Sequence, residues 1–268
     1  MSKVVLITGG SSGIGEAIGT HLSAKGYTVY GTSRNPDRLT GQQPFPLLKL
    51  DVNNADNAVS VCKHIVDTEG RIDVLINNAG VGVTGPMEEV PEAEMRKVFD
   101  TNFFGPVNMM KAVLPYMRKE GSGLIINITS IAGYMGLPYR GVYSAVKGAL
   151  SLASESMQME LAEMGVDVCD LAPGDFNTNI AQGRYHAPID SDSDYAKSYA
   201  RVMDVINSQM DSASDPSRVG EKVAAIIESG RRKRHYKVGG FMEVFSVRLK
   251  ELLPDKVFNK LLRNHYKL

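Results

Sequence analysis

Tyr143 and Lys147 are the pair of residues whose types and spacing first suggest chemistry in this chain. They lie four positions apart in a segment, residues 143–159, whose composition favours a helix, so their side chains share one helical face. A phenol has a pKa near ~10, and a tyrosine that exchanges protons near neutrality needs a shift of roughly 3 units, about 4 kcal/mol. A unit charge at ~4 Å in an effective dielectric of ~20 contributes about 4 kcal/mol. A protonated Lys147 would therefore allow Tyr143 to act as a general acid or base.

Ser130 supplies a hydroxyl that could hold the oxygen of a reacting group. It follows an apolar run, residues 124–128, that is typical of a buried strand. In open α/β sheets the residues of the crevice gather at the carboxyl ends of the strands. A tyrosine and a lysine at this spacing are common on helices, and a serine in a loop is an ordinary turn residue. Together the three residues indicate a site for proton transfer to an oxygen atom.

A glycine-rich turn follows the first apolar run, residues 4–7. The sequence Thr-Gly-Gly-Ser-Ser-Gly-Ile-Gly at residues 8–15 leads into a segment with helical spacing. In that setting glycines allow a tight turn, and backbone N–H groups at the start of the helix can bind a pyrophosphate. The pattern is TGxxxGxG rather than GxGxxG, and a turn without a ligand is the alternative. The residues expected to contact a dinucleotide here are Gly9, Ser11, Ser12, Gly13, Ile14 and Gly15.

The elements that must position these residues alternate between strand and helix. Gly26, Gly70 and Gly165 stand where left-handed caps would end helices before strands. Helical spacing occurs, for example, at Ile14, Ile18 and Leu22, and again at Val59, Cys62, Ile65 and Val66. Buried strands are expected at residues 4–7, 28–30, 47–50, 74–76, 124–128, 166–171 and 236–238. The alternation predicts an α/β fold: a single Rossmann-type domain with a doubly wound parallel sheet.

The end of the chain differs from its body in charge. Residues 231–268 carry 11 Lys and Arg against 3 Asp and Glu, which leaves 19 against 27 in residues 1–230. We expect a Rossmann-type domain over residues 1–240, with a substrate loop at about 179–216, and a basic amphipathic C-terminal extension over residues 241–268. Such an extension can pack against the body, cover the crevice, join a second subunit or contact anionic lipid.

Taken together, these segments resemble the short-chain dehydrogenase/reductase family in its classical branch. The matching elements are residues 8–15, Asp51-Val52, Asn77-Asn78-Ala79-Gly80, Asn102, Ser130, residues 143–147, Pro173-Gly174 and Thr178. They cover about residues 3–180 in the family's order. The resemblance implies a catalytic set of Asn102, Ser130, Tyr143 and Lys147. In such a set Tyr143 protonates the carbonyl oxygen that Ser130 holds, Lys147 tunes Tyr143, and Asn102 holds a water that links Lys147 to solvent.

The resemblance also implies how a nicotinamide dinucleotide is bound. Asp51 receives the adenine amino group and Val52 lies beside the ring. Asp51 could also cap a helix, alone or together with that role. Asn78, Ala79 and Gly80 pass under the adenosine ribose, whereas Asn77 is expected to steady the sheet. On the nicotinamide side the family pattern gives Tyr143, Lys147, Pro173, Gly174, Phe176 and Thr178, with Lys147 on the ribose and Thr178 on the carboxamide.

The choice between the two nicotinamide cofactors depends on the end of the second strand, residues 31–35. An acidic residue that would accept from the ribose 2′-OH is missing there, and Ser33 and Arg34 stand in its place. A guanidinium pairs well with a 2′-phosphate, so the sequence predicts NADP(H). An Arg34 that is only a solvated surface residue would leave open the alternative, an NAD-dependent alcohol dehydrogenase.

The expected reaction is the interconversion of a carbonyl and an alcohol on a small, hydrophobic molecule such as a steroid, retinoid or lipid-like compound. Substrate contacts are expected from the residues after Gly133, from residues 81–87 and from the insertion after Asn179. Apolar and aromatic side chains suggest this class of substrate, although they are also ordinary packing residues: Tyr134, Met135, Leu137, Tyr139, Phe176 and Tyr185. A module that binds NADP(H) without turnover is the alternative from another class, but it would not need Tyr143 and Lys147 together.

Composition excludes several other classes. The two cysteines, Cys62 and Cys169, have neither disulfide-framework nor zinc-ligand spacing, so a reducing cytoplasm and no metal site are expected. The sequence contains no run of ~18 apolar residues that would predict a membrane span. The C-terminal extension is the candidate for peripheral membrane contact. A nucleic-acid partner is not expected, because basic residues with interleaved aromatics do not cover the main fold. The family resemblance implies a homo-oligomer formed through residues 99–110 and 143–159.

Overall fold

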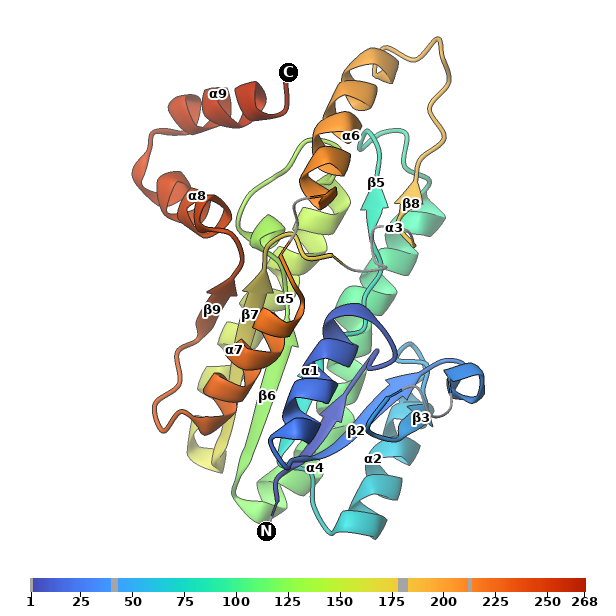
Figure 1. The fold of residues 1–268 in the computed structure, drawn as a ribbon, viewed down its shortest axis with the longest axis vertical. Helices are drawn as coiled ribbons and strands as arrows, with labels where there is room; N and C mark the ends of the chain where they lie inside the picture. Colours follow the sequence, from blue (N-terminus) through green and yellow to red (C-terminus); the bar gives the residue numbers. More distant parts are fainter. Residues whose placement is uncertain (1, 40–42, 178–182, 212–213) are drawn as a thin grey trace.

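The computed structural model describes residues 2–39, 43–177, 183–211 and 214–268 of the chain (Figure 1). Within these residues seven parallel strands form one sheet in the order β3-β2-β1-β4-β6-β7-β9. The strands are β1 (Val4–Ile7), β2 (Thr28–Ser33), β3 (Leu47–Lys49), β4 (Val74–Asn77), β6 (Gly123–Ile128), β7 (Val166–Pro173) and β9 (His235–Val238). The winding direction reverses between β1 and β4, and such a switch point opens a crevice at the carboxyl ends of the strands.

Both faces of the sheet are buried, and successive side chains of each central strand point to opposite faces. Leu6 of β1 and Ile125 of β6 belong to one apolar cluster, whereas their neighbours Ile7 and Ile126 belong to another. All four side chains have no exposed surface. This burial explains why the strands are near-continuous apolar runs in the sequence rather than alternating ones.

Helices cover the two faces. Helix α1 (Gly13–Ala24) and helix α7 (Ser217–Glu228) pack on the face of Ile7. Helices α2 (Ala55–Glu69), α4 (Gly105–Glu120) and α5 (Gly141–Glu160) lie on the face of Leu6 (Figure 1). Helix α3 (Glu92–Phe99) precedes a π-helical turn, η2 (Asp100–Phe104), which leads into α4.

The predicted fold class is confirmed, and most details of the predicted elements hold. Gly26, Gly70 and Gly165 have φ values of 84°, 81° and 71°, as left-handed caps require. Val59 was expected on the buried face of helix α2, but it is 52% exposed, while Cys62 and Ile65 of the same helix are buried.

The predicted loop, residues 179–216, contains elements that the sequence did not reveal. A two-residue strand β8 (Tyr185–His186) pairs with β5 (Val83–Thr84), and helix α6 (Ala196–Asp211) follows. Strands this short carry no periodicity of their own, so only the tertiary contact defines them.

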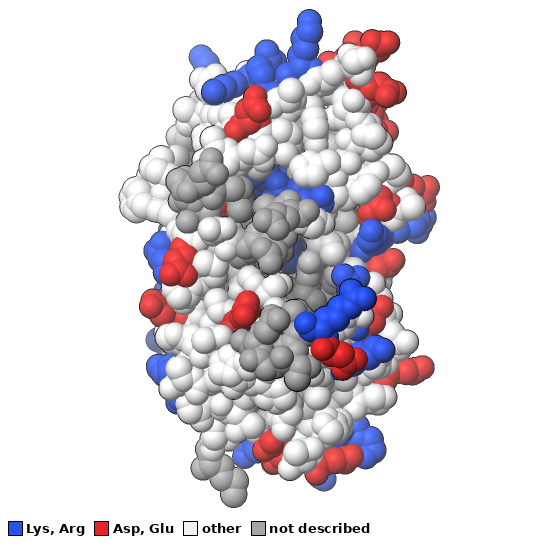
Figure 2. All heavy atoms as spheres, turned by 45° about the vertical axis from the view of Figure 1, so that its right-hand side comes forward, with Lys and Arg blue, Asp and Glu red and all other residues white. Residues whose placement is uncertain are grey.

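The C-terminal extension folds as two helices, α8 (Phe241–Leu252) and α9 (Asp255–His265), which are separated at Pro254. It packs against the body through Val247, Phe258 and Tyr266, all at most 5% exposed. Phe241 and Leu252 remain 78% and 77% exposed. Figure 2 shows Lys and Arg gathered at the upper end of the molecule, where α6 and α9 lie in Figure 1. Among the described residues, no helix combines the length and the apolar character needed to cross a membrane.

Candidate active site

The glycine turn between β1 and α1 forms a compact cradle. Gly9 and Gly13 have φ values of 66° and 56°, which other residues rarely adopt. A Cβ atom on Gly15 would lie 2.2 Å from the carbonyl oxygen of Gly9, so only glycine fits there. Ser12 is the N-cap of α1, yet its side chain makes no capping hydrogen bond. The first N–H groups of α1 and the Ser12 hydroxyl are therefore suited to an anion such as a pyrophosphate.

A groove of about 330 Å³ runs from this turn across the sheet edge. Its lining includes most of the residues expected on the adenosine side: Gly9, Ser11, Ser12, Gly13, Ile14, Ser33, Arg34, Asp51, Val52, Asn78, Ala79 and Gly80. Gly15 is absent from that lining because it packs against the turn itself. The sequence did not single out Thr32, Asn35, Asn53 or Thr101, which line the same groove.

The loop after β4 is tied to the glycine turn. The Thr8 hydroxyl accepts from the backbone N–H groups of Asn78 and Ala79, both at 3.0 Å. The Asn78 amide donates to the carbonyl oxygens of Thr8 and Gly9 at 3.0 and 3.1 Å. Asn77, by contrast, donates to Asn127 on β6 at 2.8 Å, in agreement with its expected role in the sheet.

Asp51 does not cap a helix, so that alternative is wrong. The N-cap of α2 is Asn54, whose side chain accepts from the Asn57 N–H at 2.9 Å. The Asp51 carboxylate instead accepts from the Asn53 N–H at 3.0 Å and lines the groove. Its second oxygen is left for a ligand such as an amino group.

Tyr143 and Lys147 lie on one face of α5 and line a second pocket, continuous with the groove through Ile14, Asn78, Gly80 and Val81. The Lys147 Nζ atom lies 5.9 Å from the centre of the Tyr143 ring and donates to the Ile128 carbonyl oxygen at 2.9 Å. Burial lowers the pKa of Lys147 to about 8, because removal from water disfavours the ammonium. Lys147 is thus poised to exchange protons near physiological pH.

The pKa of Tyr143 is raised above the ordinary value of a phenol, and opposing influences act on it. Burial raises it most, and Arg184 and Arg140 lower it through their positive charges. A hydrogen bond with Ser130 lowers it further, while Asp175 raises it. The lowered pKa expected for Tyr143 is therefore not observed: burial outweighs the positive charges, and those charges come from Arg184 and Arg140 rather than from Lys147. The pocket around Tyr143 is consequently rich in positive charge that can stabilise a phenolate.

Asn102 occupies the π-helical turn η2 and is fully buried. Its side-chain oxygen accepts from the Val81 N–H and its amide donates to the Val81 carbonyl, both at 2.8 Å. A Cβ atom on Gly80 would lie 2.8 Å from the Asn102 oxygen and 3.7 Å from Lys147 Nζ. Asn102 therefore lies behind the pocket wall, close to Lys147, and holds the loop after β4; it lines neither the groove nor the pocket.

The remaining predicted residues lie on the wall opposite α5. Pro173, Gly174 and Phe176 line the pocket, whereas Thr178 lies outside the described residues. Of the substrate candidates, Met135 and Leu137 line the apolar pocket described below, and Tyr134, Tyr139 and Tyr185 line none of these cavities.

Three charged residues of the pocket were missed by the sequence analysis: Arg140, Asp175 and Arg184. Asp175 directly follows Pro173-Gly174, and Arg140 lies three residues before Tyr143, so nearness to the motifs was an available signal. Arg184 had no comparable signal, because it reaches the pocket only through the pairing of β8 with β5.

A third cavity, of about 360 Å³, opens beneath the C-terminal helices. We call it the tail pocket. Its apolar lining comes from both the body and the extension: Ile131, Ala132, Met135, Leu137, Met242, Leu249, Phe258, Leu261 and Leu262. Four residues line both this cavity and the pocket of Tyr143: Ser130, Arg140, Gly174 and Asp175. An apolar chamber therefore adjoins the candidate proton donor.

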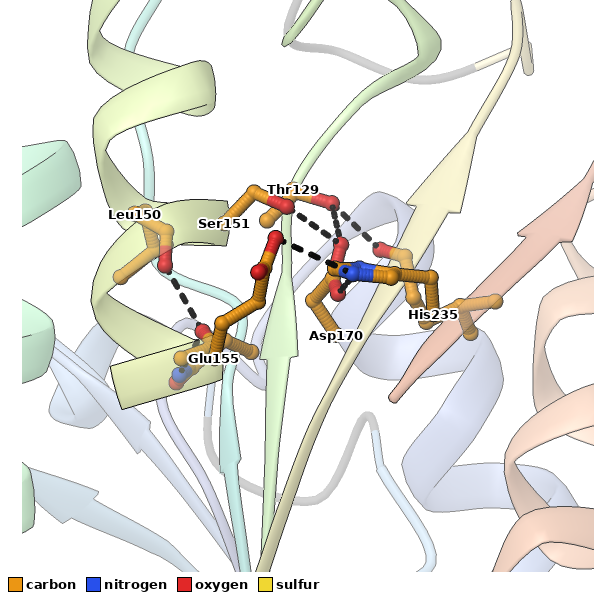
Figure 3. Close-up of polar contacts among 9 residues, drawn as sticks. Thr129, Leu150, Ser151, Glu155, Asp170 and His235 are labelled. Carbon is orange, nitrogen blue, oxygen red and sulfur yellow. Dashed lines mark hydrogen bonds and ion pairs between the residues drawn. The ribbon is translucent and has the colours of Figure 1, made fainter. Parts of the chain in front are cut away.

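A buried polar network surrounds Asp170 and includes Thr129, the residue before Ser130 (Figure 3). Asp170 of β7 has no exposed surface and accepts from Thr129 at 3.0 Å, from Ser151 at 3.3 Å and from His235. His235 of β9 also pairs with Glu155 of α5 at 3.2 Å. Burial raises the pKa of Asp170. The network joins three elements at the strand end that carries Ser130.

The chain is similar to known proteins over most of its length. The short chain dehydrogenase family matches residues 3–188. A 3-ketodihydrosphingosine reductase of Bacteroides thetaiotaomicron is 40% identical over 265 residues, which cover 98% of each chain. A short-chain dehydrogenase from Streptomyces avermitilis is 31% identical, with a TM-score of 0.83 over 97% of this chain and 96% of that one. A short chain dehydrogenase from Burkholderia cenocepacia in complex with NADP is 25% identical, with a TM-score of 0.77 over 97% and 98%. The chain therefore belongs to the short-chain dehydrogenase family, whose members are oxidoreductases that use nicotinamide cofactors.

Proposed function

We propose that the protein is an NADP(H)-dependent reductase of a carbonyl group on a long-chain lipid, with long-chain amino ketones of the 3-ketodihydrosphingosine type as the substrate class. One observation carries the proposal: Ser130 and the Tyr143 pocket lie between the groove lined by the glycine turn and the tail pocket. A carbonyl at this point contacts the proton donor Tyr143, while an attached hydrocarbon chain can extend into the tail pocket.

The groove supports NADP(H) through residues at its two ends. The glycine cradle and the start of α1 suit the pyrophosphate, and Arg34 stands exposed at the rim beside Ser33, where a ribose 2′-phosphate would lie. The neighbour from Burkholderia cenocepacia, which binds NADP, agrees with this choice. When bound, the reduced cofactor supplies a hydride to the carbonyl carbon.

The chain's own residues supply the proton and the positioning. Tyr143 donates its phenolic proton to the carbonyl oxygen, and Ser130 donates a hydrogen bond to the same oxygen. The positive charges of Arg140 and Arg184 stabilise the resulting phenolate, and Lys147 Nζ lies 5.9 Å from the centre of the Tyr143 ring. Lys147 then returns a proton to Tyr143, for which its pKa of about 8 is suitable.

The tail pocket supports a lipid substrate. Nine of its eighteen lining residues are apolar, and burial of each CH₂ of a hydrocarbon chain contributes about 0.8 kcal/mol. The relative from Bacteroides thetaiotaomicron, named for 3-ketodihydrosphingosine, aligns over 98% of this chain and so includes the C-terminal helices that form the pocket.

The test is the loss of absorbance at 340 nm with NADPH and 3-ketodihydrosphingosine. We expect turnover with NADPH and at least tenfold lower kcat/KM with NADH. An Arg34→Ser variant should lose roughly 10- to 100-fold in kcat/KM for NADPH, because a charge-assisted pair is removed, and little for NADH. Arg38→Ser is the matched control, because Arg38 is also exposed but does not line the groove. Equal efficiency with NADH, or no turnover of any long-chain ketone, would refute the proposal.

A further inference from the structure

The outer surface of helix α8 is apolar. Phe241, Phe245 and Leu252 recur at helical spacing on one side of this helix, and all three side chains are exposed. The rings of Phe241 and Phe245 stack on each other, with their centres 5.6 Å apart. We call these three residues the apolar stripe. Single exposed apolar side chains are ordinary, but several along one helix mark a surface that contacts a protein or a membrane.

The outer surface of helix α9 is basic. Lys256, Lys260 and Arg263 are exposed on the side of this helix that points away from the buried Phe258, and they line one shallow hollow. None of the three forms an ion pair with the described residues. The acid of this helix, Asp255, lies at its first position. We call the three cations the basic face, and their unpaired charge is suited to an anionic partner.

The tail pocket opens beside both surfaces. Met242 and Leu261 line this pocket, yet their side chains are 66% and 48% exposed, so they lie at its mouth. Met242 follows Phe241 of the apolar stripe, and Leu261 follows Lys260 of the basic face. Helices α8 and α9 form one corner of the molecule (Figure 1). A hydrocarbon chain that enters by this mouth therefore comes from the surface that carries the stripe and the basic face.

An anionic bilayer fits all three features. Apolar side chains enter the boundary between its headgroups and acyl chains, and each Lys or Arg near its surface strengthens binding about fivefold. A second copy of this chain also offers negative charge, because residues 1–230 carry 27 Asp and Glu against 19 Lys and Arg. A second copy seated here would, however, cover the mouth of the tail pocket. A bilayer leaves the mouth in contact with the phase in which long hydrocarbon chains dissolve.

We propose that the apolar stripe and the basic face dock on a bilayer that contains anionic phospholipids, with the mouth of the tail pocket turned toward it. The inference goes beyond the proposed function, because it concerns the outer surface of the C-terminal helices and not the reacting groups. A long-chain substrate then passes from the bilayer into the tail pocket without crossing water. Docking also accounts for the exposure of Phe241 and Leu252 in an extension that otherwise packs against the body.

The first test measures the binding of the protein to sedimented vesicles, which needs no turnover. We expect wild-type protein to bind phosphatidylcholine vesicles containing about one third phosphatidylglycerol at least about tenfold more tightly than pure phosphatidylcholine vesicles. Added NaCl should weaken this binding steeply. Lys260→Gln/Arg263→Gln should lose about 10- to 30-fold in affinity for the anionic vesicles. The matched control is Arg118→Gln/Lys119→Gln, two exposed cations in the last turn of α4, which should bind like wild type.

The second test addresses the apolar stripe. Phe241→Ser/Leu252→Ser should lower the affinity for vesicles of either composition by about tenfold or more, because less apolar surface leaves water on docking. Val59→Ser, which replaces an exposed apolar side chain of α2, is the control and should bind like wild type. All of these side chains are exposed, so a thermal melt should show unchanged folding. Reduction of a short, water-soluble ketone should also be unchanged.

The other outcomes overturn the inference or separate it from the proposed function. Wild-type protein that does not bind anionic vesicles overturns it, and so do equal losses in the variants and their controls. If light scattering shows a wild-type dimer that does not bind vesicles and a monomeric Phe241→Ser/Leu252→Ser variant, a second copy covers the surface and the inference is wrong. Turnover of the long-chain ketone without vesicle binding overturns the inference alone. Vesicle binding without turnover supports the inference and refutes the proposed function.

Discussion

This protein has two buried polar clusters, one around Asp170 and one around Tyr143. They differ in how completely their polar and charged groups are paired. Around Asp170, each charged group meets a partner: Thr129, Ser151 and His235 donate to the carboxylate, and His235 also reaches Glu155 (Figure 3). Around Tyr143, the described residues leave charge unmatched. Arg140 has one ion pair at 3.9 Å, and Lys147 donates to a single carbonyl.

The difference separates a structural use of charge from a functional one. A buried ion pair with complete hydrogen bonding holds elements together, and removing one member leaves the others uncompensated. A cluster with spare donors costs folding stability but is ready to stabilise charge that develops on a ligand. Thr129 and Ser130 are adjacent in the chain, so the saturated cluster fixes the strand end on which the open cluster is built.

Among the changes to the cluster of Tyr143, Arg140 and Lys147, which we call the open cluster, removal of the Tyr143 hydroxyl should change activity most. Tyr143→Phe should lower kcat by about 10³-fold, because the general acid is lost, while the melting temperature and NADPH affinity stay near wild type. The measurement is NADPH oxidation at 340 nm together with a thermal melt. Tyr27→Phe, at the opposite end of the sheet from the pocket, is the control. Wild-type turnover by a folded Tyr143→Phe protein would contradict the mechanism.

Removal of the Asp170 carboxylate should have the reverse profile. Asp170→Ala should lower the free energy of unfolding by about 3 kcal/mol, because His235 and two hydroxyls lose a buried partner. NADPH affinity should change less than threefold. Urea unfolding provides the measurement, with Asp67→Ala as control, since Asp67 forms an exposed ion pair worth at most ~1 kcal/mol. If both variants lose the same stability, the Asp170 cluster is not the structural one.

The destabilising effect of the buried Lys147 can be measured from how the free energy of unfolding changes with pH. Lys147 has a folded-state pKa of about 8 against 10.5 in the unfolded chain, so the unfolded state binds more protons between these values. Its contribution to stability therefore rises with pH in this window, by about 2 kcal/mol from pH 7.5 to 9.5. Lys147→Met should lack this gain. The difference between the two proteins in urea unfolding isolates Lys147 from other groups, and parallel pH profiles would exclude the assignment.

The smallest expected effect concerns Arg184. Its positive charge lowers the pKa of Tyr143, so Arg184→Gln should move the pH at which alcohol oxidation becomes fast upward by about 0.5 to 1 unit. Arg184→Lys, which keeps the charge, should restore most of the wild-type profile. A purely structural role for Arg184 would lower the rate at every pH without moving the profile.

Agreement between the predicted and observed fold follows from local patterns. The strands are continuous apolar runs because helices cover both faces of the sheet, and the caps at Gly26, Gly70 and Gly165 need only backbone geometry. Two local details differ from the prediction. The Val59 side chain faces solvent because the buried face of α2 runs through Ala58, Val61, Cys62 and Ile65, and Asn54 rather than Asp51 caps α2.

Much of the candidate site was also visible in the sequence. The glycine turn, Ser130, Tyr143 and Lys147 all lie at the cavities, because strand ends and a helical spacing of four are local properties. Asn102 was predicted near Lys147 and is near it, but its bonds to Val81 are a matter of tertiary contact.

Local sequence was enough to predict the strands, the glycine cradle and the pairing of a tyrosine with a lysine, since each depends on residues only a few positions apart. Only tertiary contacts place Arg140 near Asp175 and bring Arg184 to the Tyr143 pocket. They also form the Asp170–His235 contact, across 65 positions, and the tail pocket. The physical reason is that cavities and buried charge networks form between elements, and no periodicity within one element records which partner will face it.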